Sequence, residues 1–150
     1  MKKGIDYIGV GVGAAIINKE GKVFIARRGK QTRNEQGKWE IPGGGINFSE
    51  TLEHAVKRET KEEYGMEVEI IELLGVFDHI IPDDKQHWVS PSYICKLRSG
   101  TPQILEPEKC EEIGWFTLEE AKKLDLSLVT ENDIKLLEKK YPHGLPNLYE

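Results

Sequence analysis

The first part of the chain contains two apolar runs that have the composition of β-strands. Residues Tyr7–Ile17 and Lys22–Ala26 are rich in apolar and β-branched side chains, and between them lies a polar break, Asn18–Gly21. Two such runs around a short turn predict a β-hairpin. The first run has glycine at every second position from Gly9 to Gly13, but no helix pattern follows, as a dinucleotide-binding turn requires. We therefore interpret these glycines as places where backbone or substrate approaches closely.

The rest of the chain predicts a mixture of strands and helices. A polar, glycine-containing loop covers residues 29–38, and Trp39–Pro42 leads from it into a triple glycine, Gly43–Gly45. Ile134, Leu137 and Tyr141 recur at helical spacing. The remaining patterns predict strands over Val68–Phe77, Trp88–Leu97 and Gly114–Phe116, and helices over Leu118–Leu124 and Thr130–Tyr141.

A helix is also predicted directly after the triple glycine, from Glu50 to Tyr64. Ser49 is a suitable N-cap, and Gly65 is a suitable C-terminal stop. Successive side chains of an α-helix are about 100° apart around its axis, so one set of residues lies within an arc of roughly 120°. This set begins with hydrophobic residues and ends with carboxylates. The members of this inward face are Leu52, Ala55, Val56, Glu59, Glu62 and Glu63, whereas His54, Lys57 and Lys61 point away.

The carboxylates on this face indicate a metal site. Glu59, Glu62 and Glu63 have i, i+3 and i+4 spacing, which brings side chains together on one helix face. Burying such groups side by side is costly unless a cation neutralises them. Because hard oxygen ligands suit Mg²⁺, with Mn²⁺ as the other candidate, we predict that these three residues bind a divalent metal. A solvated helix with surface ion pairs is the competing interpretation.

Length and composition restrict the class of protein. A chain of 150 residues fits a single domain, 1–150, with a core of its own. Its formal charge of −5 disfavours binding of nucleic-acid polymers through a basic surface. Cys95 and Cys110 have neither metal-ligand spacing nor a disulfide pattern, and we find no secretory signal and no apolar run of membrane-spanning length. These features predict a cytoplasmic protein without a membrane partner.

The helix and its flanks together form a known pattern. Gly44 is followed at fixed separations by Glu50, Arg58, Glu59, Thr60, Glu62, Glu63, Gly65 and Met66. This segment resembles the Nudix box, a loop–helix–loop that binds divalent metal and cleaves a diphosphate linked to a nucleoside or a related group. One position departs from the pattern, because Thr60 stands where the family usually has an aliphatic residue. Its methyl group can still pack.

The resemblance implies a fold and further metal ligands. The Nudix fold is a mixed, curved β-sheet sandwiched between α-helices, an α/β/α architecture with the pocket at the loop edge. The carbonyl oxygen of Gly44 becomes a metal ligand by this analogy. A further acidic ligand comes from the segment before Trp115, where Glu108 and Glu111 are the candidates and Glu108 is preferred. Arg58 is expected to orient a neighbouring carboxylate, Glu50, through charge-assisted hydrogen bonds.

Residues outside the box are implied more loosely. By resemblance to MutT-like proteins, Arg28 contacts phosphate, and Glu40 contacts the ribose or a metal-bound water. Asn132 would read a nucleobase edge, although Thr130–Asp133 also has the composition of a helix cap. For Trp88 we favour a place in the core over stacking on a base.

The function implied is Mg²⁺-dependent hydrolysis of a small-molecule nucleotide, most directly of a nucleoside triphosphate to the monophosphate and pyrophosphate. Glu59 leads as general base, with Glu62 and Glu63 as alternatives. ADP-ribose or another nucleotide sugar is the second substrate class. A non-catalytic domain that senses nucleotides is the third possibility, and a homodimer is common among similar proteins.

Overall fold

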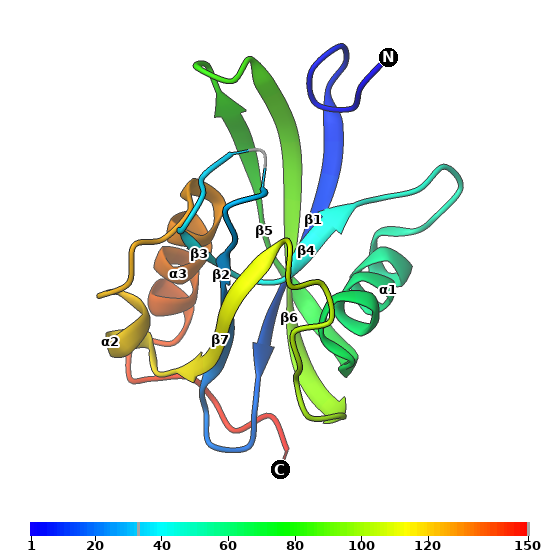
Figure 1. The fold of residues 1–150 in the computed structure, drawn as a ribbon. Coiled ribbons are helices and arrows are strands. Elements are labelled where there is room, and N and C mark those ends of the chain that lie inside the picture. Colours follow the sequence, from blue (N-terminus) through cyan, green and yellow to red (C-terminus); the bar gives the residue numbers. More distant parts are fainter. Residues whose placement is uncertain (33, 150) are drawn as a thin grey trace.

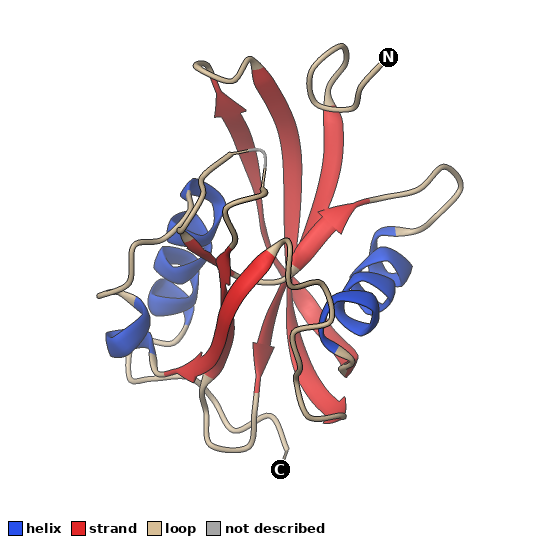
Figure 2. Ribbon diagram, viewed as in Figure 1, coloured by secondary structure: helices blue, strands red, loops and turns tan. Residues whose placement is uncertain are grey.

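The computed structural model describes residues 1–32 and 34–149. Within them a mixed β-sheet has helix α1 on one side and helices α2 and α3 on the other (Figures 1 and 2). The predicted α/β/α architecture is therefore confirmed. The strands are β1 (Gly9–Ile17), β2 (Val23–Arg28), β3 (Trp39–Glu40), β4 (Gly43–Gly45), β5 (Glu67–Ile81), β6 (Gln86–Ser99) and β7 (Cys110–Phe116), and the helices are α1 (Leu52–Tyr64), α2 (Leu118–Ala121) and α3 (Leu128–Lys140).

Strand β1 lies at the centre of the sheet and has two partners along one edge. The sheet order is β3-β2-β1-β6-β5, with β4 added on β1 and β7 on β2. Ile17, at the end of β1, pairs antiparallel with Val23 of β2, which confirms the predicted hairpin. Nearer its start, residues 11–13 of β1 pair antiparallel with the triple glycine of β4. On its other edge β1 runs parallel to β6.

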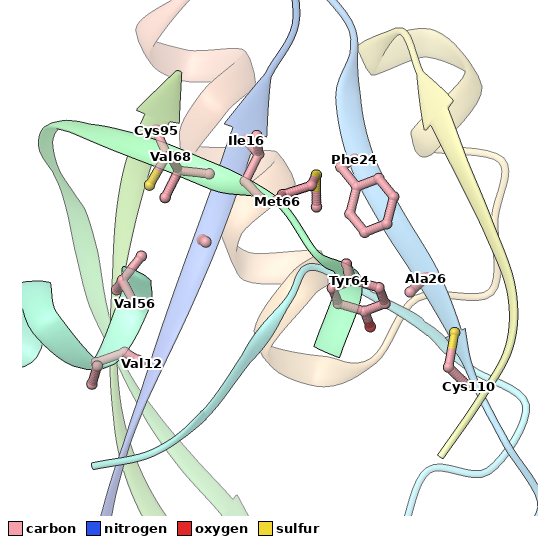
Figure 3. Close-up of a cluster of buried hydrophobic side chains, with 12 residues drawn as sticks. Val12, Ile16, Phe24, Ala26, Val56, Tyr64, Met66, Val68, Cys95 and Cys110 are labelled. Atoms are coloured by element: carbon pink, nitrogen blue, oxygen red, sulfur yellow. The ribbon is translucent and has the colours of Figure 1, made fainter. Parts of the chain in front are cut away.

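Alternation along β1 and β2 divides the core into two apolar clusters. Ala14 and Ile16 face one cluster, and Ala15 and Ile17 face the other, because successive side chains of a strand point to opposite faces. The first cluster packs under α1 around Phe24, Tyr64 and Met66, as Figure 3 shows. The second packs under α2 and α3. The fold thus holds α1 rigidly against one face of β1.

Helix α1 begins two residues later than predicted and ends where predicted. Its N-cap is Thr51, whose hydroxyl accepts a hydrogen bond from the His54 backbone N–H at 3.1 Å. Ser49 is not the cap, because it has a left-handed backbone conformation, with φ of 69°, in the preceding turn. Gly65 ends the helix at φ of 71°, a conformation that glycine adopts without steric cost.

Other boundaries also differ from the prediction. Strands β5 and β6 extend beyond Val68–Phe77 and Trp88–Leu97 at both ends, since they pair with each other along nearly their whole length. Helix α3 begins at Leu128 after Ser127, so Thr130–Asp133 lies inside the helix and is not its cap. Strand β7 starts earlier, at Cys110, and α2 ends earlier, at Ala121. No helix in the described residues is long and apolar enough to span a membrane.

Candidate active site

The junction between β4 and α1 brings Gly44 against Glu59. A side chain at position 44 would place its Cβ 2.4 Å from the carboxylate carbon of Glu59, closer than van der Waals contact allows. Glycine at this position therefore lets the backbone of β4 pass near the carboxylate without displacing it. The Glu59 side chain is 15% exposed, and burial raises its pKa even though Arg58 favours the ionised form. The first two elements of the predicted metal site are thus adjacent.

Glu63 lies one helical turn further along α1, and its carboxylate is largely buried. Its Oε1 is shielded from solvent and has no hydrogen-bond partner among the described residues. Burial, and after it the negative charges of Glu59, Glu40 and Glu106, raise the pKa of Glu63 to about 9. A buried carboxylate surrounded by other carboxylates is stable in its ionised form only beside a cation.

Glu62 differs from its neighbours. Its side chain is 58% exposed, so the prediction that it lies on the buried face was wrong. Instead its Oε2 lies 3.3 Å from Nη1 of Arg58 at the rim of the site. As a result, no three His, Cys, Asp or Glu side chains in residues 1–32 and 34–149 form a ready-made metal site. The exposed side chain of Glu62 would have to rotate to bring its carboxylate to those of Glu59 and Glu63.

Arg58 organises the site by binding several oxygen atoms at once. Its Nε and Nη2 donate to the two oxygens of Glu50 at 2.6 and 2.8 Å, and Nη1 donates to Glu59 Oε1 at 2.9 Å. Nη2 also donates to the carbonyl oxygen of Gly45 at 3.0 Å. The pairing with Glu50 expected from the sequence is therefore present. Arg58 fixes the position of α1 relative to the glycine strand.

Thr60, the departure from the Nudix box, is fully buried in the core side of α1. Its hydroxyl donates within the helix to the carbonyl oxygens of Val56 at 3.0 Å and Lys57 at 3.1 Å. The polar group is thus satisfied without any partner outside the helix, while the methyl group fills apolar space. The helix tolerates the substitution for this reason.

The segment before Trp115 places a third acidic residue nearer to Glu63 than the predicted candidates. Glu106 is close enough to raise the pKa of Glu63, whereas Glu108 is exposed. Glu111 forms an ion pair with Arg27 at 3.0 Å. The placement therefore favours Glu106 over Glu108 and Glu111 as the extra carboxylate of the site. No spacing signal in the sequence singled it out, since its position depends on the loop conformation.

A cavity of about 310 Å³ adjoins the triple glycine. At one side Nη1 of Arg28 donates to both oxygens of Glu40, at 2.8 and 3.0 Å. Asn34 also accepts from this guanidinium, at Oδ1 from Nη2 at 2.9 Å. Arg28 and Glu40, which were predicted to contact different parts of a substrate, thus form one ion pair in the wall of the cavity. Burial raises the pKa of Glu40, and Arg28 opposes this effect.

Helix α3 contributes Asp133 to the cavity, while Asn132 is not among the residues that line it. Asp133 is 1% exposed and its Oδ2 accepts a hydrogen bond from Ser92 at 2.8 Å. Burial raises the pKa of Asp133 to about 7. Asp133 is therefore the residue of α3 in the cavity lining, and the contact of Asn132 with a nucleobase stays a prediction.

Trp88 also lines the cavity and belongs to neither apolar cluster. The favoured prediction of a core position was thus wrong. The reason is that Gln86, Trp88, Ser90 and Ser92 occupy alternate positions of β6 and so share the face that the cavity exposes.

Comparison with known proteins agrees with this geometry. A family model of the NUDIX domain matches residues 8–139. The chain belongs to the Nudix family. A solved structure of a MutT NUDIX hydrolase from Burkholderia pseudomallei superposes with a TM-score of 0.80 at 36% identity, covering 87% of this chain and 98% of that one. The predicted family and fold are both confirmed.

Two other members of the family are similar to this Nudix chain over about three quarters of its length. It is 30% identical over 111 residues to a MutT-like protein of Streptomyces ambofaciens, covering 74% of this chain and 65% of the relative. It is 31% identical over 109 residues to an ADP-ribose pyrophosphatase of Methanocaldococcus jannaschii, covering 73% of this chain and 62% of the relative. The chain spans less than two thirds of the length of either relative.

Proposed function

We propose that this Nudix chain is a divalent-metal-dependent pyrophosphohydrolase that converts a nucleoside triphosphate to the monophosphate and pyrophosphate. The observation that carries the proposal is the buried Oε1 of Glu63, which has no hydrogen-bond partner in residues 1–32 and 34–149 and lies one turn from Glu59 at the glycine strand. A helix that served only to pack would have no use for this carboxylate. A site that holds a cation requires it.

The residues present fit a magnesium ion. The donors are all hard oxygens, from the carboxylates of Glu59 and Glu63 and the carbonyl of Gly44, with Glu62 and Glu106 as further ligands. When bound, Mg²⁺ or Mn²⁺ neutralises charge on the phosphate oxygens and lowers the pKa of a water molecule. Gly44 leaves room for such a ligand set, because it has no side chain beside Glu59.

Three residues of the chain have separate roles in the reaction. Glu59 accepts the proton of the attacking water at a carboxylate oxygen, and Arg58 holds that carboxylate through the hydrogen bond from Nη1 to Oε1 at 2.9 Å. Arg58 is itself fixed by Glu50, so its role is to position Glu59. Arg28, through an N–H group left over from Glu40 and Asn34, contacts the substrate from the cavity wall.

A triphosphate is the preferred substrate because the sequence resembles MutT-like proteins. A solved MutT NUDIX hydrolase, 36% identical to this chain in an alignment that covers 98% of its own length, supports that resemblance. ADP-ribose is the second candidate, because one relative of 31% identity is named an ADP-ribose pyrophosphatase. Both substrates contain a diphosphate attached to a nucleoside. They differ in the group beyond it, so a direct comparison of turnover decides between them.

The test is a panel of (d)NTPs, oxidised dGTP, ADP-ribose and dinucleoside polyphosphates, with products separated by ion-exchange chromatography. We expect Mg²⁺-dependent release of pyrophosphate and a nucleoside monophosphate from at least one triphosphate. Faster cleavage of ADP-ribose to AMP would favour the second candidate. Tight nucleotide binding without turnover across the panel would contradict the proposal and identify a sensing domain.

Variants of α1 test the assignment of the base. Glu59→Gln should reduce turnover at saturating Mg²⁺ by about a hundredfold or more, the scale of a lost general base. Glu62→Gln should have a smaller effect on turnover and a larger one on the Mg²⁺ concentration required. Glu53→Gln, an exposed acid in the first turn of the same helix, is the matched control. Near-normal turnover of Glu59→Gln would exclude Glu59 as the base.

A further inference from the structure

The indole of Trp88 lies in a space that two glycines leave open. A Cβ on Gly9 would come within 2.6 Å of the six-membered ring, and one on Gly4 within 2.3 Å of Nε1. A Cβ on Gly11 or Gly45 would lie 3.6 or 3.8 Å from the ring, which is ordinary contact. Larger residues at Gly4 and Gly9 would displace the ring. Gly9, at the start of β1, therefore makes room for an aromatic side chain.

Gln86 fixes the orientation of this ring. The indole Nε1 donates a hydrogen bond to Gln86 Oε1 at 2.9 Å, and Gln86 is only 5% exposed. Because an indole N–H can only donate, the hydrogen bond also fixes the orientation of the Gln86 side-chain amide. Its oxygen points toward Trp88 and its nitrogen points away. Nε2 of Gln86 then lies buried without an acceptor among the described residues. The one polar atom of the indole is satisfied inside the protein.

The part of Trp88 that faces the cavity is consequently aromatic carbon. The rest of the cavity lining combines apolar residues with a few polar side chains, which are Arg28 and Glu40 at one side and Asp133 with Ser92 on the side of α3. An aromatic surface in such a cavity beside a diphosphate site suits one part of a nucleotide, the planar base. Stacking on an aromatic side chain contributes to the binding of every base, since each has a π-face.

We infer that Trp88 is the surface on which the base of the substrate packs and that Gln86 positions its ring for this contact. This inference rests on the proposed function and narrows it, because it selects diphosphates that contain a nucleobase over diphosphates that do not. Trp88 contacts substrate, whereas Gln86 acts through Trp88. Neither residue takes part in proton transfer or metal binding.

Equilibrium binding tests the inference without requiring turnover. The probes are α,β-methylene-ATP and α,β-methylene-UTP, which contain a base, and inorganic tripolyphosphate, which does not, each titrated calorimetrically with Mg²⁺. Trp88→Leu should weaken binding of both nucleotides by about tenfold or more, which is the scale of one lost stacking contact. Trp88→Phe should retain most of the affinity. Binding of tripolyphosphate should be unchanged in both variants.

Variants of Gln86 separate positioning from packing. Gln86→Leu removes the acceptor for the indole N–H and should weaken nucleotide binding severalfold, with tripolyphosphate again unaffected. Gln86→Glu retains an acceptor oxygen and should restore the affinity. In uniformly ¹⁵N-labelled protein, nucleotide should shift the indole N–H signal of Trp88, assigned with Trp88→Phe, and tripolyphosphate should not. If Trp88→Leu does not fold, this measurement on the unmodified chain tests whether the base contacts Trp88.

Three results would overturn the inference: equal losses for nucleotide and tripolyphosphate, no loss for either, or an indole signal that nucleotide leaves in place. Failure of the proposed function is distinct from these. Nucleotide binding that depends on Trp88 but is never followed by Mg²⁺-dependent cleavage would contradict the hydrolase and support the base contact. Nucleotide cleavage that Trp88→Leu leaves unchanged would support the hydrolase and contradict the base contact.

Discussion

Arg58 binds both carboxylate oxygens of Glu50, through Nε at 2.6 Å and Nη2 at 2.8 Å. This two-point contact joins the middle of α1 to the turn before it. Hydrogen bonds from Arg58, and then from the backbone N–H of Asn47, hold the pKa of Glu50 well below its usual range. Glu50 is therefore ionised in the folded protein at neutral pH.

The stability that Glu50 contributes should depend on pH in one direction. Because its folded pKa is depressed, the contribution is fully present above the unfolded value of about 4.3 and disappears as the pH falls below it. The difference in unfolding free energy between the wild type and Glu50→Gln should thus be constant from pH 8 to pH 6 and shrink below about pH 4. Urea unfolding at each pH measures it. A difference that grows in acid would show that the pair does not act this way.

Glu63→Gln should stabilise the metal-free protein and weaken its response to metal. The buried Oε1 of Glu63 has no partner in the described residues, so neutralising the group relieves a penalty of about 1–3 kcal/mol. In EDTA we expect the melting temperature to rise by a few degrees. On addition of Mg²⁺ the wild type should gain stability, and the variant should gain less. A variant that is less stable in EDTA and equally stabilised by Mg²⁺ would argue against a metal at Glu63.

Asp133→Asn should stabilise the protein increasingly as the pH rises. Burial raises the folded pKa of Asp133 to about 7, above the unfolded value of about 3.9, so ionisation opposes folding between these values and the full penalty applies above pH 7. The variant should be more stable than the wild type by about 2 kcal/mol or more at pH 8 and nearly equal at pH 4. Urea unfolding of Glu131→Gln, an exposed acid of the same helix, provides the control. An advantage that does not depend on pH would contradict the prediction.

Thr60→Val should be neutral or stabilising by up to about 1 kcal/mol. The buried hydroxyl donates only to Val56 and Lys57 of its own helix, and such bonds slightly destabilise helices. Valine has nearly the same shape and needs no partner. Thermal unfolding measures the change, and turnover should not alter. A loss of stability above 1 kcal/mol would show that the hydroxyl is needed.

The sequence predicted what depends on local periodicity and capping. The hairpin of β1 and β2, the end of α1 at Gly65 and the contact between Arg58 and Glu50 follow from spacing within short segments. The exposure of Glu62 did not follow, because one helix arc does not tell how far the neighbouring strand extends over it. Side chains at the end of a helix face can lie beyond the surface that buries the rest.

The cavity lining could not be predicted from the sequence, because it depends on packing between distant elements. Asn132 and Asp133 differ by about 100° around α3, and only the packing of that helix decides which one meets Ser92. Trp88 was expected in the core because aromatic residues usually are, but β6 extends past the helices that cover its lower part (Figure 1). The sequence within a few residues of Asp133 or Trp88 does not indicate that either side chain lines the cavity.

The two-partner edge of β1 explains where the cavity forms. Since β2 and β4 both pair with this one strand and then separate, the chain between them must turn outward, and it carries Arg28, Asn34 and Glu40 to the gap. The opening is thus a product of strand connectivity and not of any particular side chain. Substitutions around it can change which molecule is recognised while the scaffold beneath stays the same, so a new specificity can evolve here without a new architecture.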